Sequence, residues 1–349
     1  MRQNTKRNII GRFFAFFCCV ITISFSGCLV DGTVSNASPT VVFTTTWQYI
    51  SETYSFFELK QLDWDAVKRR YEAKVNNSIS SDSLFTVCAA MVSELRDGHS
   101  YIGRKAASGS AGGQMFDVKY FYFEQGYEIH FSLPNVVKYL VEPQQKGRFL
   151  LTGMIGDSIG YVYYAGFNDS ESGLWQNVMD NFKQKGVRKI ILDIRNNGGG
   201  EPRIATDLCG YFVQNPTVVG SMTQKNGKGR NDFSPKLSLT ALPRSPYLGN
   251  VRVNVVINRS SFSASSYLAG MMVNLPNVQL IGQITGGGGG GELPFELPNG
   301  WVVSVSCNYF TDSKGKHIEN GVEPTIPINN TAEDVKQGKD RMLEMAIAR

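Results

Sequence analysis

Hydrophobic and polar positions follow two different periods along this chain. In the N-terminal part, apolar residues recur at every third or fourth position, as at Leu84, Cys88 and Met91, and this spacing predicts helices. Asp63 stands directly before a second segment of this kind, where its carboxylate can cap a helix. We therefore expect a small helical domain over residues 41–100.

The second half of the chain alternates between strand-like and helix-like patterns. Short apolar runs at 159–164, 189–193 and 251–257 are typical of buried strands, and amphipathic segments separate them. Strands that alternate with helices usually pair in parallel. The predicted fold class is therefore a layered α/β core with a mostly parallel sheet, over residues 154–330. A last helix is expected at 331–349.

The residues between these two regions have a third pattern. Residues 101–153 contain short alternating and aromatic-rich runs, which predict a β-rich connecting segment. A hairpin is predicted later in the chain, because apolar runs at 293–297 and 301–305 flank the turn sequence PNG. The expected order is helices, a β-rich connection and then the α/β core.

The N-terminus has a composition of its own. Four basic residues with no acid among them precede an apolar run at 13–25. This run is too short to cross a bilayer as a helix, so the pattern predicts an exported protein with a signal peptide at 1–27. A short membrane anchor is the alternative.

Ser26 and Gly27 are small residues directly before Cys28, and this arrangement resembles the lipobox of bacterial lipoproteins. The resemblance implies that Cys28 becomes the acylated first residue. The residues that follow are small and polar, which predicts a lipid-anchored tether over 28–40. The protein would then be a lipoprotein of the bacterial cell envelope, held to a membrane by its lipid, on the periplasmic face or the cell surface. A plain secretory cleavage that leaves Cys28 as a free thiol is the alternative.

Charge and cysteine content exclude several classes of function. Of the 35 basic residues four lie in the signal segment, which leaves 31 against 30 acidic residues. This balance is too even for a nucleic-acid-binding surface. Cys88, Cys209 and Cys307 are scattered and show no zinc-ligand spacing, so we expect no metal, no cofactor and no disulfide framework. Cys88 and Cys209 lie on apolar helix faces and are expected in the core.

Two loops follow buried strands of the predicted core, at the edge of the sheet where α/β proteins place functional groups. Ser263 comes six residues after the strand at 251–257 and opens a helix, so it is either an N-cap or a nucleophile. In the second case the N–H of Ala264 can hold an oxyanion. The other loop, DIRNNGGG at 193–200, lacks the Lys-Ser/Thr of a phosphate-binding loop.

Five segments, in this order along residues 90–330, resemble the motifs of tail-specific (C-terminal-processing) peptidases and the related tricorn-core proteases: ELRDGHSYI, LDIRNNGGG, NRSSFSASSYLAG, GQITGGGGGG and HIENGVEPTIPI. The resemblance implies a crotonase-like αββ core and a serine-type endopeptidase that cleaves extended or unfolded polypeptides. Many members also carry a PDZ domain. The segment from Tyr101 to Gly153 is too short for one, so we expect none.

The same resemblance assigns roles to single residues. It makes Ser263 the nucleophile, and the N–H groups of Gly199 and Ala264 the oxyanion hole. Asn197 would fix the glycine loop. Two positions depart from the family pattern, because Ser266 stands in place of an acid after the nucleophile and a threonine replaces an aspartate near the end of the last motif.

The general base is assigned from a third difference between this sequence and the family pattern. The tail-specific branch uses a lysine, but Gly288 occupies that position here. The tricorn-like branch uses a histidine and a glutamate, which correspond to His99 and Glu319. His317 is a rival base, because it lies two residues from Glu319. A neighbouring carboxylate would raise the pKa of His99.

Two other classes of function remain as alternatives. A catalytically inactive protein on this scaffold could bind peptides or lipids, because a fold alone does not fix a function. In that case Ser263, His99 and Glu319 would have no reason to converge. A carbohydrate-acting enzyme would need paired carboxylates in a cleft, and no motif suggests such a pair.

Overall fold

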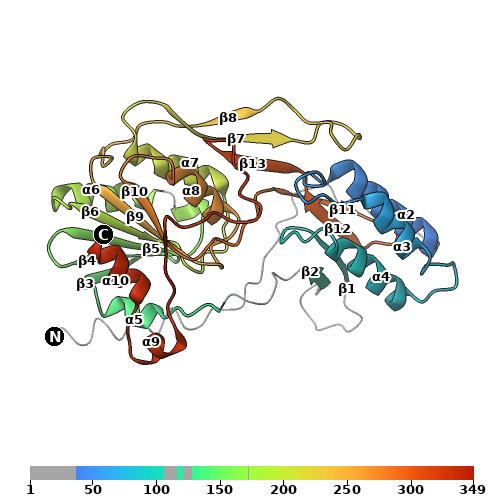
Figure 1. Cartoon of the computed structure of the whole chain (residues 1–349), viewed down its shortest axis with the longest axis horizontal. Coiled ribbons are helices and arrows are strands. Elements are labelled where there is room, and N and C mark those ends of the chain that lie inside the picture. The colour runs from blue at the N-terminus through green and yellow to red at the C-terminus, as the bar shows by residue number, and fades with distance from the viewer. Residues whose placement is uncertain (1–36, 106–115, 121–127, 172) are drawn as a thin grey trace.

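The computed structural model describes residues 37–105, 116–120, 128–171 and 173–349. The chain forms two lobes, with the N-terminal helices at one end and a large sheet at the other (Figure 1). The predicted signal peptide and Cys28 lie outside the described residues. Among the residues that are described, no helix is long and apolar enough to cross a membrane.

The large lobe is built on a seven-stranded sheet in the order β14-β10-β9-β6-β5-β4-β3. The four pairs from β14 to β5 are parallel, and β3 and β4 extend the sheet antiparallel. The predicted α/β class with a mostly parallel sheet is therefore confirmed. The strands are β3 Val141–Lys146, β4 Leu150–Ile155, β5 Ile159–Tyr164, β6 Lys189–Asp193, β9 Arg252–Ile257, β10 Val278–Gly282 and β14 Ile326–Pro327.

The other strands form two smaller sheets. One has the order β11-β12-β1-β2 and the other β13-β7-β8. The predicted hairpin is confirmed, because β11 and β12 pair antiparallel. Figure 1 shows β7, β8 and β13 running along the top of the large lobe toward the helical lobe. Their bounds are β1 Tyr101–Lys105, β2 Phe116–Tyr120, β7 Thr217–Gln224, β8 Leu237–Ala241, β11 Glu292–Glu296, β12 Val302–Ser306 and β13 Asn308–Asp312.

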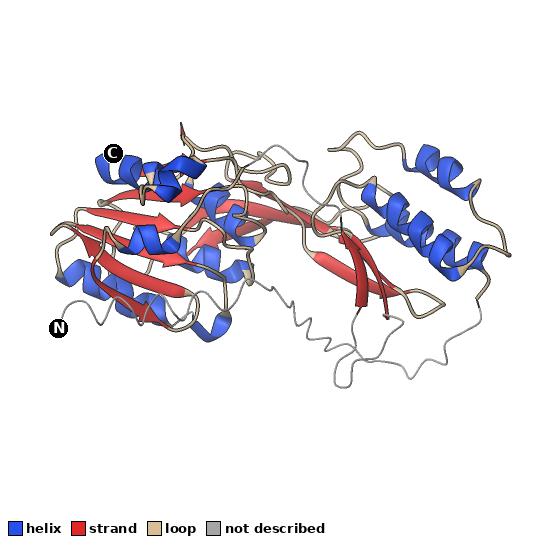
Figure 2. Ribbon diagram, turned by 90° about the horizontal axis from the view of Figure 1, so that it is seen from below, coloured by secondary structure: helices blue, strands red, loops and turns tan. Residues whose placement is uncertain are grey.

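Helices cover both faces of the large sheet (Figure 2). On one face α6, α7 and α8 bury their apolar sides against alternate strand residues such as Leu192 and Val255. On the other face α5 and α10 pack on the intervening residues, such as Ile191 and Val256. The helices are α2 Pro39–Thr53, α3 Trp64–Glu72, α4 Ser81–Ser93, α5 Leu133–Val137, α6 Leu174–Gln184, α7 Pro202–Cys209, α8 Ala264–Met272, α9 Ala332–Lys336 and α10 Arg341–Ala348.

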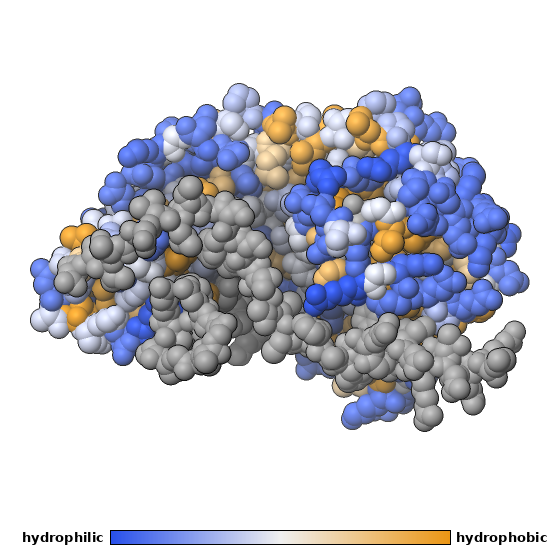
Figure 3. All heavy atoms as spheres, turned by 180° about the vertical axis from the view of Figure 1, so that it is seen from behind, coloured by the Kyte–Doolittle hydropathy of each residue, from blue (hydrophilic) through white to orange (hydrophobic). Residues whose placement is uncertain are grey.

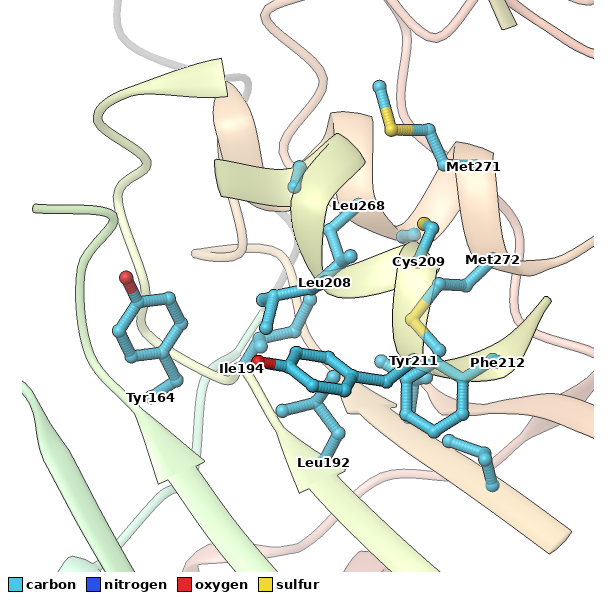
Figure 4. Packing of buried hydrophobic residues seen from close by; sticks show 14 of the residues in the cluster. Tyr164, Leu192, Ile194, Leu208, Cys209, Tyr211, Phe212, Leu268, Met271 and Met272 are labelled. Carbon is cyan, nitrogen blue, oxygen red and sulfur yellow. The ribbon is translucent and has the colours of Figure 1, made fainter. Parts of the chain in front are cut away.

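The contact between α7 and α8 lies directly behind the two loops singled out in the sequence. Leu208 of α7 and Leu268 of α8 meet over Leu192 at the end of β6 (Figure 4). Cys209 is fully buried here and Cys88 is fully buried in the other lobe, as expected. Since both helices begin at the carboxyl edge of the sheet, their packing fixes where the loops before them lie.

The small lobe combines segments that are far apart in the sequence. Helices α2, α3 and α4 share a core with β1 and with the hairpin β11–β12, where the rings of Phe85 and Trp301 meet edge to face at 5.1 Å. Residues 292–306 thus pack with the N-terminal helices although they follow most of the large lobe in sequence. The domain boundaries expected from the sequence remain an interpretation.

Local helix signals agree with the structure at two termini. Asp63 accepts a hydrogen bond from the N–H of Ala66 at 2.9 Å and begins α3. Thr331 and Asp334 form a capping box at α9. The C-terminal segment contains two helices, α9 and α10, where a single helix was expected. Among the residues that are coloured in Figure 3, hydrophilic side chains make up most of the visible surface, with smaller apolar patches between them.

Candidate active site

Ser263 lies at the turn between β9 and α8, at the carboxyl edge of the large sheet. It occupies the N-cap position of α8 with φ 55° and ψ −122°, and within the described chain its hydroxyl makes no capping hydrogen bond. A non-glycine residue in such a conformation stores about 1–3 kcal/mol of strain, which occurs mostly at functional sites. The simple interpretation of Ser263 as a helix cap is therefore not supported by its geometry.

Hydrogen bonds hold this turn from two sides. The N–H of Ser263 donates to the carbonyl of Gly287 at 2.9 Å, and the N–H of Phe262 donates to the carbonyl of Asn197 at 2.9 Å. Ser261 Oγ also donates to the carbonyl of Ile194 at 2.8 Å. The serine turn is thus fixed between the loop after β6 and the glycine segment 286–291.

The loop after β6 lies against the serine turn. Asn197 is fully buried; its Nδ2 donates to the carbonyl of Tyr164 at 2.8 Å, and its Oδ1 accepts from the N–H of Gly199 at 2.9 Å. A Cβ added at Gly199 would lie 2.7 Å from Cβ of Ser263 and 3.0 Å from the nitrogen of Ala264. The expected oxyanion donors, Gly199 and Ala264, therefore flank Ser263, although the N–H of Gly199 already bonds Asn197.

The glycine segment 286–291 brings the other two expected residues to the same place. Gly288 lies against the ring of His99, because a Cβ added there would be 3.0 Å from Cε1 of His99 and 2.5 Å from the ring of Phe262. The N–H of Gly289 donates to Oε2 of Glu319 at 2.9 Å. Since this segment also bonds Ser263, it contacts all three residues of the expected set.

The close packing around Gly288 leaves no space for a lysine side chain as the general base. Gly288 has φ 75°, and a side chain at this position would overlap Phe262 and His99. A lysine therefore cannot occupy the position that it has in the tail-specific branch without displacing its neighbours. The site accommodates a histidine in the corresponding space.

His99 is almost fully buried at 7% exposure. Its ring packs on Phe262 with 4.7 Å between centroids, and its main-chain N–H donates to Oδ1 of Asp97 at 2.9 Å. Nδ1 of His99 is buried without a hydrogen-bond partner among the described residues. Burial lowers the pKa of His99, partly offset by Asp97. The pKa increase expected from the sequence is thus wrong in direction, since burial dominates.

Glu319 is buried behind the glycine segment at 5% exposure. Its Oε1 accepts from Nζ of Lys60 at 2.7 Å and its Oε2 accepts from Gly289. Burial and the charge of Asp97 raise the pKa of Glu319 to about 7, against the opposing effects of Lys60 and Gly289. In the described chain no hydrogen bond joins Glu319 to His99.

His317 lies in a different environment. Its ring packs beside those of Tyr309 and Phe56, at 4.8 and 6.3 Å between centroids. Burial, with a smaller contribution from the charge of Lys236, lowers its pKa. The contacts of His317 are thus with an aromatic cluster, whereas those of His99 are with Phe262 and the glycine segment.

Lys60 and Asp97 are the site residues that sequence reasoning missed. Lys60 belongs to a turn of the helical lobe outside every motif, and no local pattern marked it. Asp97 stands two residues before His99 inside a motif, and it is fully buried with Oδ2 accepting from Ser100 Oγ at 2.9 Å. Among the described residues no group of three or more His, Cys, Asp or Glu side chains could hold a metal ion.

The arrangement offers the groups that acyl transfer requires. A strained serine stands at the N-terminus of a helix, where the first N–H groups have no partner in the helix. A buried imidazole, uncharged at neutral pH because of its lowered pKa, can accept a proton. The charge of Asp97 favours the charged form of the imidazole, and Glu319 is bonded to the glycine segment that lies against His99.

Comparisons with known proteins match both lobes. A model of peptidase family S41 matches residues 158–328, and a model of the tricorn protease C1 domain matches residues 35–93. The carboxy-terminal processing protease CtpB of Bacillus subtilis is 24% identical over 174 residues, which are 50% of this chain and 34% of CtpB. The chain therefore spans about a third of the length of this curated relative.

Solved structures agree over more of the chain. The structure of a candidate peptidase from Parabacteroides merdae is 30% identical, with a TM-score of 0.80, and the match covers 90% of this chain and 96% of that one. Mature CPAF matches with a TM-score of 0.67 at 12% identity, over 89% of this chain and 95% of CPAF. At that identity the second match shows the shared fold alone.

Proposed function

Because this chain belongs to peptidase family S41, we propose that it is a serine endopeptidase that cleaves extended or unfolded polypeptides, with Ser263 as its nucleophile. The observation that carries the proposal is the position of Ser263. It has strained dihedral angles at the start of α8, lies against Gly199, and is bonded to the segment that contacts His99 and Glu319.

The proposed reaction begins when Oγ of Ser263 attacks the scissile carbonyl while His99 takes its proton. The carbonyl oxygen becomes an oxyanion, which accepts from the N–H groups of Ala264 and Gly199. His99 then gives the proton to the leaving amine, and the peptide bond breaks to leave an acyl-enzyme. Water activated by His99 hydrolyses the ester and restores Ser263.

The positions of Ala264, Gly199 and Glu319 support the roles proposed for them. Ala264 is the first residue of α8, so its N–H has no acceptor within the helix. Gly199 would exchange its bond to Asn197 for one to the oxyanion. Glu319 would stabilise the imidazolium form of His99 by its charge, acting from behind the glycine segment.

His99 is the preferred base on two grounds. Its ring contacts Phe262, the neighbour of Ser263, whereas the rings around His317 belong to Phe56 and Tyr309. Its lowered pKa also keeps the imidazole neutral and able to accept a proton at neutral pH.

Labelling with a fluorophosphonate tests the proposal. This reagent bonds covalently to activated serines, so the wild type is expected to be labelled and Ser263→Ala is expected not to be. Ser260→Ala is a matched control, because Ser260 lies in the same turn and should leave labelling unchanged. Equal labelling of wild type and Ser263→Ala would exclude Ser263 as the nucleophile.

A binding protein on the same scaffold is the alternative function. It predicts no labelling of Ser263 and no hydrolysis of an unfolded protein at any pH by well-folded material. The buried Nδ1 of His99, the Glu319 carboxylate at the same segment and the strain at Ser263 favour the enzyme, since binding alone requires none of them.

We also propose that the chain is exported and anchored by a lipid on Cys28. The support is the basic, apolar and small-residue pattern before Cys28. Expression in a bacterial host with membrane fractionation tests this, and Cys28→Ser should be soluble or unprocessed. If Cys28→Ser still sediments fully with the membranes, the lipid is not the anchor.

A further inference from the structure

Lys60 extends from the small lobe into the proposed catalytic centre. It lies in the turn between α2 and α3, where its N–H donates to the carbonyl of Phe56 at 3.0 Å. Its Nζ lies 2.7 Å from Oε1 of Glu319, and the two side chains are 11% and 3% exposed. This contact is therefore a buried ion pair between the small lobe and the segment that follows β13.

The same ammonium group also bonds the turn that carries His99. Nζ of Lys60 donates to the carbonyl of Arg96 at 2.6 Å, three residues before His99. Arg96 has φ 48°, and the turn is closed by the bond from the main-chain N–H of His99 to Oδ1 of Asp97. Lys60 thus joins the backbone of the His99 turn to the carboxylate of Glu319.

The carboxylate requires such a partner. Removing a carboxylate from water favours its protonated form, and a second carboxylate nearby adds to this effect. Asp97 is that second carboxylate, and burial with Asp97 raises the pKa of Glu319 while Lys60 lowers it. A buried carboxylate that loses its cation takes up a proton or destabilises the fold.

We propose that Lys60 is a positioning residue of this centre, which favours the ionised form of Glu319 and fixes it relative to the turn that carries His99. The inference rests on the proposed function, since it takes His99 as the base and Glu319 as its charge partner. Lys60 touches no substrate in this scheme. It acts through Glu319, so its removal should change the chemical step more than substrate binding.

The experiment compares Lys60→Met, Lys60→Arg and Lys228→Met in the hydrolysis of fluorescently labelled casein across pH. Lys228 is the matched control, because it also forms an ion pair between the lobes. Its partner is Glu52 at 3.8 Å, but the side chain of Lys228 is 84% exposed. Circular dichroism and thermal melting check that each variant is folded.

For Lys60→Met we expect kcat to fall by about tenfold or more with KM little changed, since general acid–base assistance is weakened. The acid limb of kcat/KM should move to higher pH, because the pKa of Glu319 rises when its cation is lost. Lys60→Arg keeps the charge, so the acid limb of its kcat/KM profile should lie closer to that of the wild type than the limb of Lys60→Met does. Lys228→Met should match the wild type.

A double-mutant cycle separates positioning from a merely structural role. Lys60→Met combined with Glu319→Gln should be no slower than Glu319→Gln alone, because the two residues act as one unit. Multiplicative losses, or a Lys60→Met variant with wild-type kcat and acid limb, would overturn the inference. If Lys60→Met does not fold, Lys60→Gln, which keeps donor groups without the charge, gives the same comparison.

The labelling and pH experiments distinguish failure of the proposed function from failure of the proposed role of Lys60. If Ser263→Ala is labelled like the wild type, the proposed function is wrong and this inference is wrong with it. If Ser263→Ala loses labelling while Lys60→Met keeps the wild-type pH profile, the function stands and only the role of Lys60 is rejected.

Discussion

The main-chain N–H of Phe262 donates a hydrogen bond to the carbonyl oxygen of Asn197 across 2.9 Å. The two residues belong to loops that follow β9 and β6, which are parallel neighbours, so the carboxyl ends of the two strands meet. Oγ of Ser265 donates to the same carbonyl at 2.8 Å. The serine turn and the glycine loop therefore form one bonded unit, and a change in either loop should reach the other.

Asn197→Ala tests this unit. The variant loses the bonds from Nδ2 to Tyr164 and from Gly199 to Oδ1, so the glycine loop is no longer fixed. We expect kcat to fall by about 10- to 100-fold with a small change in KM, because misplacing an oxyanion donor affects mainly the transition state. Steady-state hydrolysis of a peptide substrate measures this.

Asn135→Ala is the control for Asn197→Ala. Asn135 is also buried and its Nδ2 donates to the carbonyl of Val335 at 2.8 Å, but its bonds lie among α5 and α9. It should lose stability without losing kcat. A rise in kcat for Asn197→Ala would show instead that Asn197 competes with the oxyanion for the N–H of Gly199.

Gly288→Ala tests the contact between the glycine segment and His99. The added Cβ would lie 2.5 Å from the ring of Phe262 and 3.0 Å from Cε1 of His99, so these rings must move. We expect kcat/KM to fall by about 10- to 100-fold, because small displacements of reacting groups have large effects on rate.

Gly315→Ala separates crowding from backbone strain. Gly315 has φ 82°, close to the 75° of Gly288, but a Cβ added at Gly315 meets nothing within 4 Å. It should cost about 1 kcal/mol of stability and leave kcat/KM unchanged. Equal loss of activity in both variants would mean that strain, and not the contact with His99, explains the effect.

The pH dependence of kcat/KM reports the charge of Glu319. Its pKa is raised to about 7, so as the pH falls through that value the carboxylate takes up a proton and stops stabilising the imidazolium. His99 has a lowered pKa and stays neutral over this range. The wild type should therefore show an acid limb at about pH 7, from Glu319.

Glu319→Gln should remove this limb. The variant is expected to have a lower plateau, and the remaining limb, from His99, should lie at more acid pH. An unchanged limb in Glu319→Gln would exclude Glu319 as its source. A wild-type profile that still rises steeply above pH ~9 would point to a lysine base, whose reference pKa is near ~10.4.

Asp340→Ala tests the buried support of the glycine loop. Nη1 of Arg195 lies 2.9 Å from Oδ1 of Asp340, and Nη2 lies 2.5 Å from Oδ2 of Asp193, with all three side chains at most 1% exposed. Removing one partner leaves the buried guanidinium with a single carboxylate. We expect a loss of about 3 kcal/mol or more in the free energy of unfolding, measured with urea.

An exposed pair provides the comparison for Asp340→Ala. Arg203 and Asp169 lie 2.6 Å apart with side chains 59% and 61% exposed. Asp169→Ala should change the free energy of unfolding by about 0–1 kcal/mol, because water screens the pair. If the two variants lose the same stability, burial is not what makes the contact of Arg195 important.

The sequence by itself determined the elements of the core. The runs at 159–164 and 189–193 became β5 and β6 with the expected bounds, because strands covered by helices on both faces must be apolar throughout. Ordered motifs likewise indicated Ser263, Gly199 and His99 as neighbours. The structure brings the loops of Ser263 and Gly199 together because parallel strands carry both to one edge of the sheet.

Only the tertiary structure decided what depends on distant segments. It placed β11 and β12 on the N-terminal helices, and it brought Lys60 to Glu319 across 259 positions of sequence. It also reversed the expected direction of the pKa of His99, since burial outweighs charge there. Local periodicity carries no information on such contacts, because desolvation and ion pairing depend on every chain segment that surrounds a group.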